Sequence, residues 1–259
     1  MRTWYLMGSN IIITGIPRSG TSLMCRIIDS LASAICLNES MPHKWHTSLL
    51  NYAFLKIRLK LFLGMRVENR TESDGMASSD TQRVSAIREA ISTQKKSGRR
   101  LLLASKRTIP YLEQLGSITD KHYKVIAMVR NPHDTISSHL MIHNPNVPMC
   151  NICPPNPHSC WHNVGLEFNS DDEIERLAQA WNYLAGRVLE AKDKLYMQRL
   201  EDLLEDPESA LASMSEWLGE DISAGRRFVR SHNRHYAPDA SILRALDAYC
   251  PNRIHLGYK

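Results

Sequence analysis

The segment that most constrains the fold of this chain is Gly15-Ile-Pro-Arg-Ser-Gly-Thr-Ser22. It follows a short β-branched run at residues 10–14, which predicts a buried strand, and it precedes apolar residues at helical spacing over residues 22–31. A strand, a glycine-containing loop and a helix in this order are typical of a phosphate-binding loop. The other interpretation is a strand-to-helix turn without a ligand.

The loop departs from the usual phosphate-loop pattern at one position. Thr21 stands where a lysine is expected, and Arg18 supplies a cation before the second glycine instead. Loop N–H groups, a helix N-terminus and three hydroxyls can still bind an anion. The predicted anion-binding residues are Arg18, Ser19, Gly20, Thr21 and Ser22. The missing lysine counts against an ordinary ATPase or GTPase.

Strand and helix signals alternate along the rest of the chain. Strands are predicted at residues 101–104, 123–129 and 195–200, and helices at 80–96, after Pro132, at 171–194 and at 206–219. This alternation predicts an α/β fold, a single domain over residues 1–259 with a central parallel sheet flanked by helices, similar to P-loop nucleotide hydrolases. Residues 143–170 are expected to form a long Cys- and Pro-rich loop, either substrate-binding or a lid.

A second candidate anion site follows the strand at residues 123–129. Arg130 stands where that strand should end, and Ser138 lies eight residues further on, on the same face of the following helix as Asp134. Ligands of open α/β sheets bind at the carboxyl ends of strands, so Arg130 and Ser138 could hold a second phosphate. A surface arginine at a strand end is the alternative.

Together, GIPRSGTSLM and VRNPHDTISS resemble the sulfotransferase superfamily, whose members use 3′-phosphoadenosine 5′-phosphosulfate (PAPS). The segment from Leu200 to Pro207, followed by a helix ending at Trp217-Leu-Gly219, is similar to a later family segment. The resemblance covers roughly residues 9–40, 100–140 and 195–219. It implies that the first motif binds the 5′-phosphosulfate, that Arg130 and Ser138 bind the 3′-phosphate, and that Arg18 stabilises the leaving group.

The resemblance also bears on the catalytic base. Thr108 occupies the position of the histidine used by cytosolic members, whereas Glu39 matches the glutamate of the tyrosylprotein and some bacterial members. Glu39 is therefore the predicted base, with His43 or His46 as alternatives. Lys106 is a candidate second cation near the sulfate, and Arg230 only loosely matches the segment that covers the nucleotide in relatives.

The amino-acid composition limits the kinds of partner that this protein is expected to bind. The 32 Lys and Arg against 27 Asp and Glu give a net charge of +5 without a basic stripe, which does not favour a nucleic-acid binder. The most apolar stretch, residues 49–63, contains three cations and is too short to span a bilayer. With no targeting segment in view, a cytoplasmic protein is expected, so Cys25, Cys36 and Cys250 are predicted to be core thiols.

The remaining cysteines are clustered. Cys150, Cys153 and Cys160 lie with His158 and His162 in one short stretch. Four such ligands could form a structural zinc site. Free thiols, a disulfide formed on handling, or a loop that shapes the substrate pocket are the other interpretations.

These observations favour a PAPS-dependent sulfotransferase that forms 3′-phosphoadenosine 5′-phosphate (PAP) as product. The acceptor would be the hydroxyl of a small molecule, glycan or lipid, which the sequence does not identify. Two other functions remain open: a P-loop phosphotransferase such as an ATP-dependent kinase, and a sulfotransferase-like binding module without catalysis.

Overall fold

A computed structural model describes residues 10–29, 31, 34–38, 100–104, 109, 123–143, 170–229 and 236–259. Its centre is a parallel sheet with strand order β2-β3-β1-β4-β5. The strands are β1 (Asn10–Gly15), β2 (Ala34–Asn38), β3 (Arg100–Ala104), β4 (Tyr123–Val129) and β5 (Tyr196–Arg199). The predicted α/β fold with a central parallel sheet is confirmed.

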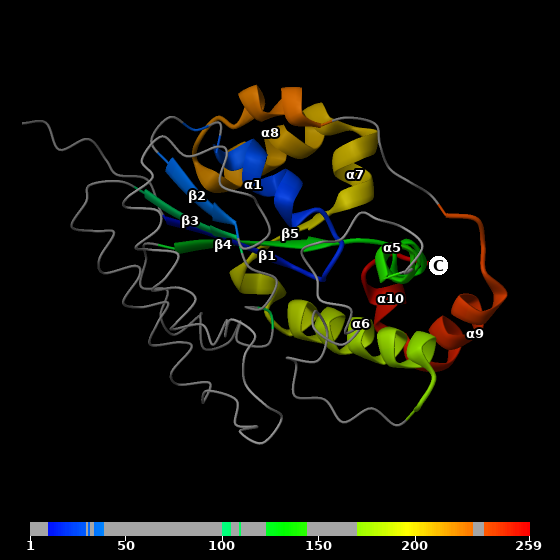
Figure 1. Ribbon diagram of the computed structural model, residues 1–259. Helices are drawn as coiled ribbons and strands as arrows, with labels where there is room; N and C mark the ends of the chain where they lie inside the picture. Colours follow the sequence, from blue (N-terminus) through cyan, green and yellow to red (C-terminus); the bar gives the residue numbers. More distant parts are fainter. Residues whose placement is uncertain are drawn as a thin grey trace, which may run out of the picture.

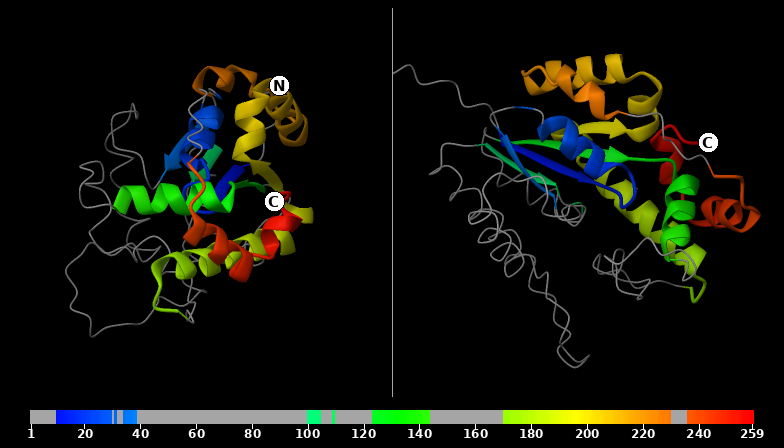
Figure 2. Two further views of the ribbon diagram at one scale, coloured as in Figure 1. Left: turned by 90° about the vertical axis from the view of Figure 1, so that its right-hand side faces the viewer. Right: turned by 45° about the horizontal axis from the view of Figure 1, so that its top comes forward.

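Helices cover both faces of the sheet. Figures 1 and 2 show α1 and α8 on one face and α6, α9 and α10 on the other, with α5 beyond the carboxyl end of β4. The helices are α1 (Thr21–Asp29), α5 (Pro132–His143), α6 (Glu173–Glu190), α7 (Leu200–Glu205), α8 (Pro207–Leu218), α9 (Ala240–Tyr249) and α10 (Asn252–His255), with 3-10 turns η4 (Lys192–Lys194) and η5 (Ser223–Phe228).

The central strand β1 contributes side chains to the buried clusters on both faces of the sheet. Ile11 and Ile13 belong to the buried cluster under α1 and α8, whereas Ile12 belongs to the cluster under α6 and α9. This alternation follows from the two-residue period of a strand. Because all three isoleucines are buried, β1 reads in the sequence as a continuous apolar run.

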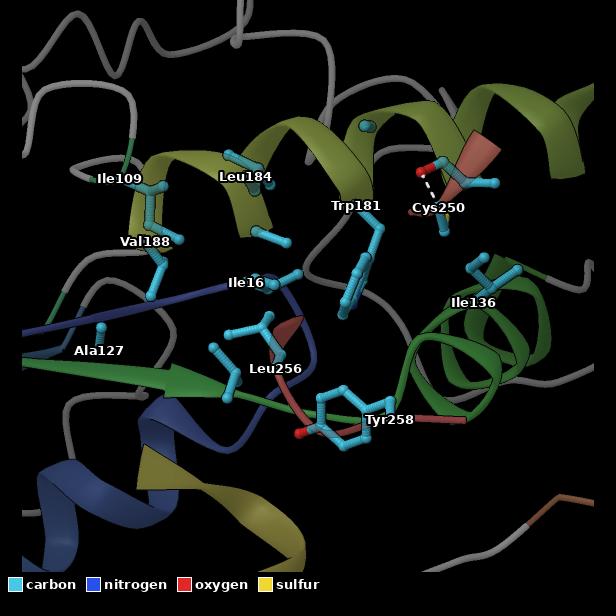
Figure 3. Close-up of a cluster of buried hydrophobic side chains, with 14 of the residues drawn as sticks. Ile16, Ile109, Ala127, Ile136, Trp181, Leu184, Val188, Cys250, Leu256 and Tyr258 are labelled. Atoms are coloured by element: carbon cyan, nitrogen blue, oxygen red, sulfur yellow. Dashed lines mark hydrogen bonds between the residues drawn. The ribbon is translucent and has the colours of Figure 1, made fainter. Parts of the chain in front are cut away.

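The cluster under α6 is built on a stripe of that helix. Trp181, Leu184 and Val188 recur at helical spacing, and Figure 3 shows them facing residues of β4 and of the C-terminal segment. Asp172 caps the helix by accepting a hydrogen bond from Glu175 N at 3.0 Å.

The boundaries of two predicted elements need correction. α6 ends at Glu190 rather than near residue 194, because the chain tightens into the 3-10 turn η4. The predicted strand at residues 195–200 is shorter, since Leu200 already begins α7. α8 starts and stops at its predicted signals, an Asp206 cap with Pro207 after it and Gly219 in the left-handed conformation at φ 70°.

The cysteine prediction is right for one residue and wrong for another. Cys250 is a free, buried thiol in the α6 cluster, as expected. Cys25 is buried in α1 as expected but is disulfide-bonded, so its predicted thiol state is wrong. Its partner is not among the side chains that the structure describes. Of the described helices, none has the length and apolar character needed to cross a membrane.

Candidate functional site

The loop between β1 and α1 is fitted closely against β4. A Cβ at Gly15 would lie 2.6 Å from the main-chain oxygen of Met128, so only glycine allows this approach. Ile16 N donates to the same oxygen at 3.1 Å. The glycine in the sequence pattern is thus required by strand packing as well as by the loop.

The backbone of the loop turns through the left-handed region twice. Arg18 has φ 70° and Gly20 has φ 92°. A non-glycine residue in this region is strained, and such strain is typical of ligand-binding loops. A Cβ at Gly20 would also lie 2.8 Å from Leu200 Cδ1, at the start of α7.

Hydrogen-bond donors converge where α1 begins. The first hydrogen bond of the helix runs from Met24 N to Gly20 O at 3.0 Å. Helix geometry therefore leaves the N–H groups of Gly20, Thr21 and Ser22 without an acceptor inside the helix. Thr21 and Ser22 are half-buried at this end, where the helix dipole attracts an anion.

Ser19 serves the loop itself. Its side chain is fully buried, and the hydroxyl lies within hydrogen-bond distance of Met128 O at 2.8 Å and of Ile16 O. This contact ties the loop to β4. A hydroxyl role for Ser19 in anion binding stays a prediction.

The two predicted anion motifs meet in the structure. Arg18 Nε donates to Ser138 Oγ at 3.1 Å, across 120 residues of sequence. Arg130 donates from a terminal guanidinium nitrogen to Arg18 O at 3.3 Å. β1 and β4 are paired neighbours, so the loop after one and the helix after the other share one edge of the sheet.

Burial differs between the two cations. Arg18 is exposed, whereas Arg130 is only 7% exposed and Ser138 only 2%. A cation held this deep at the end of a parallel strand is suited to an anionic ligand, because it has already lost most of its water. The site therefore offers one exposed and one buried guanidinium beside a helix N-terminus.

A third segment, which no sequence motif predicted, lies beside this site. Asp134 accepts a hydrogen bond from Tyr236 N at 3.2 Å, and His133 Nε2 accepts one from Asp239 N at 3.1 Å. His133 Nδ1 lies 3.6 Å from Asp134 Oδ1. The first turn of α5 thus fastens the chain that leads into α9. An Asp-capped helix signal at residue 239 could have indicated the helix, but not this contact.

Several predicted residues lie outside the described residues. These are Glu39, His43, His46, Lys106, Thr108, Arg230 and the cluster Cys150, Cys153, His158, Cys160 and His162. The helix predicted at residues 80–96 and most of the loop at 143–170 lie there as well. Within the described ranges, no three His, Cys, Asp or Glu side chains gather closely enough to hold a metal ion.

A model of the sulfotransferase family matches residues 10–224, most of the chain. The chain belongs to the sulfotransferase family. No curated protein sequence matches it.

Solved structures share the fold. The sulfotransferase STF9 from Mycobacterium avium is 15% identical, with 97% of this chain and 76% of that chain covered and a TM-score of 0.58. The sulfotransferase domain from the curacin biosynthetic pathway is 14% identical, with 98% and 99% covered and a TM-score of 0.53. At these identities the likeness supports the fold, and family membership supports sulfuryl transfer as the general activity.

Proposed function

We propose that this protein transfers the sulfuryl group of PAPS to a hydroxyl of an acceptor. The observation that carries the proposal is the junction of the two motifs, in which Arg18 donates to Ser138 and Arg130 donates to Arg18 O. A donor with anionic groups at both its 5′ and 3′ positions needs two cationic sites on one edge of the sheet.

The cationic and hydrogen-bonding groups of this site fit such a molecule. The N-terminus of α1 with Arg18 suits the 5′-phosphosulfate, and the buried pair Arg130 and Ser138 suits the 3′-phosphate. The loop contains no lysine at residue 21 to reach the β- and γ-phosphates of a nucleoside triphosphate. The two separate anion sites and the missing lysine favour PAPS over ATP as the ligand.

The proposed chemistry is a single in-line transfer. The acceptor oxygen forms a bond to sulfur while the bond from sulfur to the 5′-phosphate oxygen breaks, and Glu39 takes the acceptor proton. The residue before Glu39, Asn38, ends β2 at the same edge of the sheet as the β1 loop. Arg18 would stabilise the negative charge that develops on the leaving oxygen.

Binding of PAP tests this proposal without knowledge of the acceptor. Calorimetric titration should show that PAP binds more tightly than ADP or ATP, because only PAP carries a 3′-phosphate. Arg130→Ala should lower the affinity for PAP by at least about tenfold, since charge-assisted hydrogen bonds contribute about 1.5–3 kcal/mol. Arg26→Ala is the matched control, because Arg26 is an exposed arginine at the other end of α1.

Other results would overturn the proposal. Equal affinity for PAP and ATP, or ATP turnover that depends on magnesium, would favour the phosphotransferase instead. Tight PAP binding with no sulfuryl transfer to any of a broad panel of small alcohols, phenols, glycans and lipids would favour a binding module.

The proposal includes a cytoplasmic location, and Cys25 provides its test. Disulfides persist mainly in oxidising compartments, so the bonded Cys25 counts against the cytoplasm. Acid quenching of the cells, alkylation of thiols under denaturing conditions and mass spectrometry should label the buried Cys25 if the protein is cytoplasmic. An unlabelled Cys25 beside a labelled Cys250 in the same sample would contradict the cytoplasmic location and favour an oxidising compartment.

A further inference from the structure

The junction between β4 and α5 carries Arg130 and is held by hydrogen bonds to Asn131. Asn131 Oδ1 accepts hydrogen bonds from His133 N at 2.9 Å and Asp134 N at 3.4 Å. Its main-chain oxygen accepts from Thr135 N at 2.9 Å and from Thr135 Oγ1 at 2.8 Å. The position of the Asn131 peptide therefore sets both the start of α5 and the direction in which Arg130 leaves the sheet.

That peptide is tied to a distant part of the chain by one carboxylate. Asn131 N donates to Glu201 Oε1 at 2.8 Å. The other oxygen of the same carboxylate accepts from the hydroxyl of Tyr258 at 3.0 Å. Glu201 belongs to the acidic segment after β5, which the anion-binding motifs leave without a role.

The side chain of Tyr258 is buried and packs against two other side chains. It is 4% exposed, its ring meets Trp181 edge-on at 6.3 Å between centroids, and the Arg199 guanidinium lies 4.6 Å from its ring centre. Figure 3 shows the ring of Tyr258 below Trp181 in the α6 cluster. Burial raises the pKa of the Tyr258 hydroxyl, and the charge of Glu201 raises this pKa further, so the group stays a donor.

We propose that Glu201 and Tyr258 are positioning residues for the 3′-phosphate site, acting through the Asn131 peptide on Arg130. The inference rests on the proposed function, in which Arg130 and Ser138 bind the 3′-phosphate. Glu201 contacts the junction directly, and Tyr258 contacts Glu201. Their loss should therefore reduce discrimination for the 3′-phosphate more than affinity for the rest of the nucleotide.

The test compares PAP with adenosine 5′-phosphate, which lacks the 3′-phosphate, by competition calorimetry. Glu201→Ala should lower the preference for PAP by about tenfold, because a small misplacement of a binding group has a large effect. Glu201→Gln should restore most of it, since its amide oxygen still accepts from Asn131 N. Tyr258→Phe keeps the ring and loses only the hydroxyl, so a decrease of about threefold is expected.

Glu205→Ala is the matched control, because Glu205 is an exposed glutamate on the same helix. An equal loss of affinity for both nucleotides, or an unchanged preference in folded Glu201→Ala, would overturn the inference. If Glu201→Ala fails to fold, an unchanged preference in folded Tyr258→Phe overturns it. A wild-type protein without preference for PAP contradicts the proposed function itself, and the inference then loses its premise.

Discussion

Arg18 combines a strained backbone with a charged side chain at the site, so its two roles can be separated by substitution. Its φ of 70° favours glycine. Arg18→Gly should be more stable than Arg18→Ala by about 0.5–1 kcal/mol, because the left-handed region penalises a Cβ. Urea unfolding followed by circular dichroism measures this difference. Equal stability of the two variants would mean that residue 18 does not adopt this conformation in solution.

Both Arg18 variants should also lose sulfuryl transfer, since neither carries the guanidinium. Arg18→Gly would then be more stable than Arg18→Ala although both variants are inactive. Such a trade is expected where strain is retained at a functional loop.

A substitution at Glu39 should separate an effect on catalysis from an effect on nucleotide binding. If Glu39 is the base, Glu39→Gln should lower kcat by about 10²–10⁴-fold while leaving the affinity for PAP unchanged. Transfer of labelled sulfate to a panel of alcohols and phenols measures the first quantity, and calorimetry the second. Unchanged transfer by Glu39→Gln, with a loss in His43→Ala or His46→Ala, would assign the proton to a histidine.

Elements with strong local signals were predictable. β1 follows from its three consecutive isoleucines, and α8 from Asp206, Pro207 and Gly219 at its ends. β2 was not predicted, because a run of four apolar residues next to a helix does not by itself distinguish strand from helix. α9 carries an Asp cap like α8, so the same rule could have found it.

The cap of α9 makes a pH-dependent contribution to stability. The pKa of Asp239 is lowered, first by the Ser241 hydroxyl and then by the N–H groups of Ile242 and Ser241. A lowered folded-state pKa means that this stabilisation is present above the ordinary aspartate pKa of 3.8 and is lost as pH falls through the folded-state pKa.

Asp239→Asn isolates that contribution, because asparagine still caps a helix but carries no charge. The wild type should exceed the variant in free energy of unfolding at about pH 6, and the difference should shrink below about pH 4. Urea unfolding at a series of pH values provides the measurement. Ser241→Ala should show part of the same pH-dependent loss. A difference that does not vary with pH would contradict the role of the charge.

At the scale of the whole molecule, the meeting of Arg130 and Ser138 at one edge of the sheet was predictable, whereas the contacts behind Arg130 were not. Arg130 and Ser138 stand at positions that a strand and a helix dictate locally, so sequence spacing brings them to one edge of the sheet. The link from Asn131 through Glu201 to Tyr258 depends on how α7 and the C-terminal segment pack. No local pattern encodes that packing, because Leu200 and Leu203 of α7 are buried in the cluster under α8 whereas Tyr258 is buried in the α6 cluster.

One sheet separates two buried clusters, so both should unfold together if residues 1–259 form a single domain. Leu184 is 2% exposed in the α6 cluster, and Met214 is fully buried in the cluster under α8. Leu184→Ala and Met214→Ala should each lower the free energy of unfolding by about 2–5 kcal/mol. In each variant the urea transitions followed by circular dichroism and by fluorescence should coincide, because β1 and β4 contribute side chains to both clusters.

In the double variant the two losses of unfolding free energy should add within about 0.5 kcal/mol, since the two side chains lie on opposite faces of the sheet and belong to different clusters. Two separate transitions, or a shift seen by only one probe, would divide the chain into independent units.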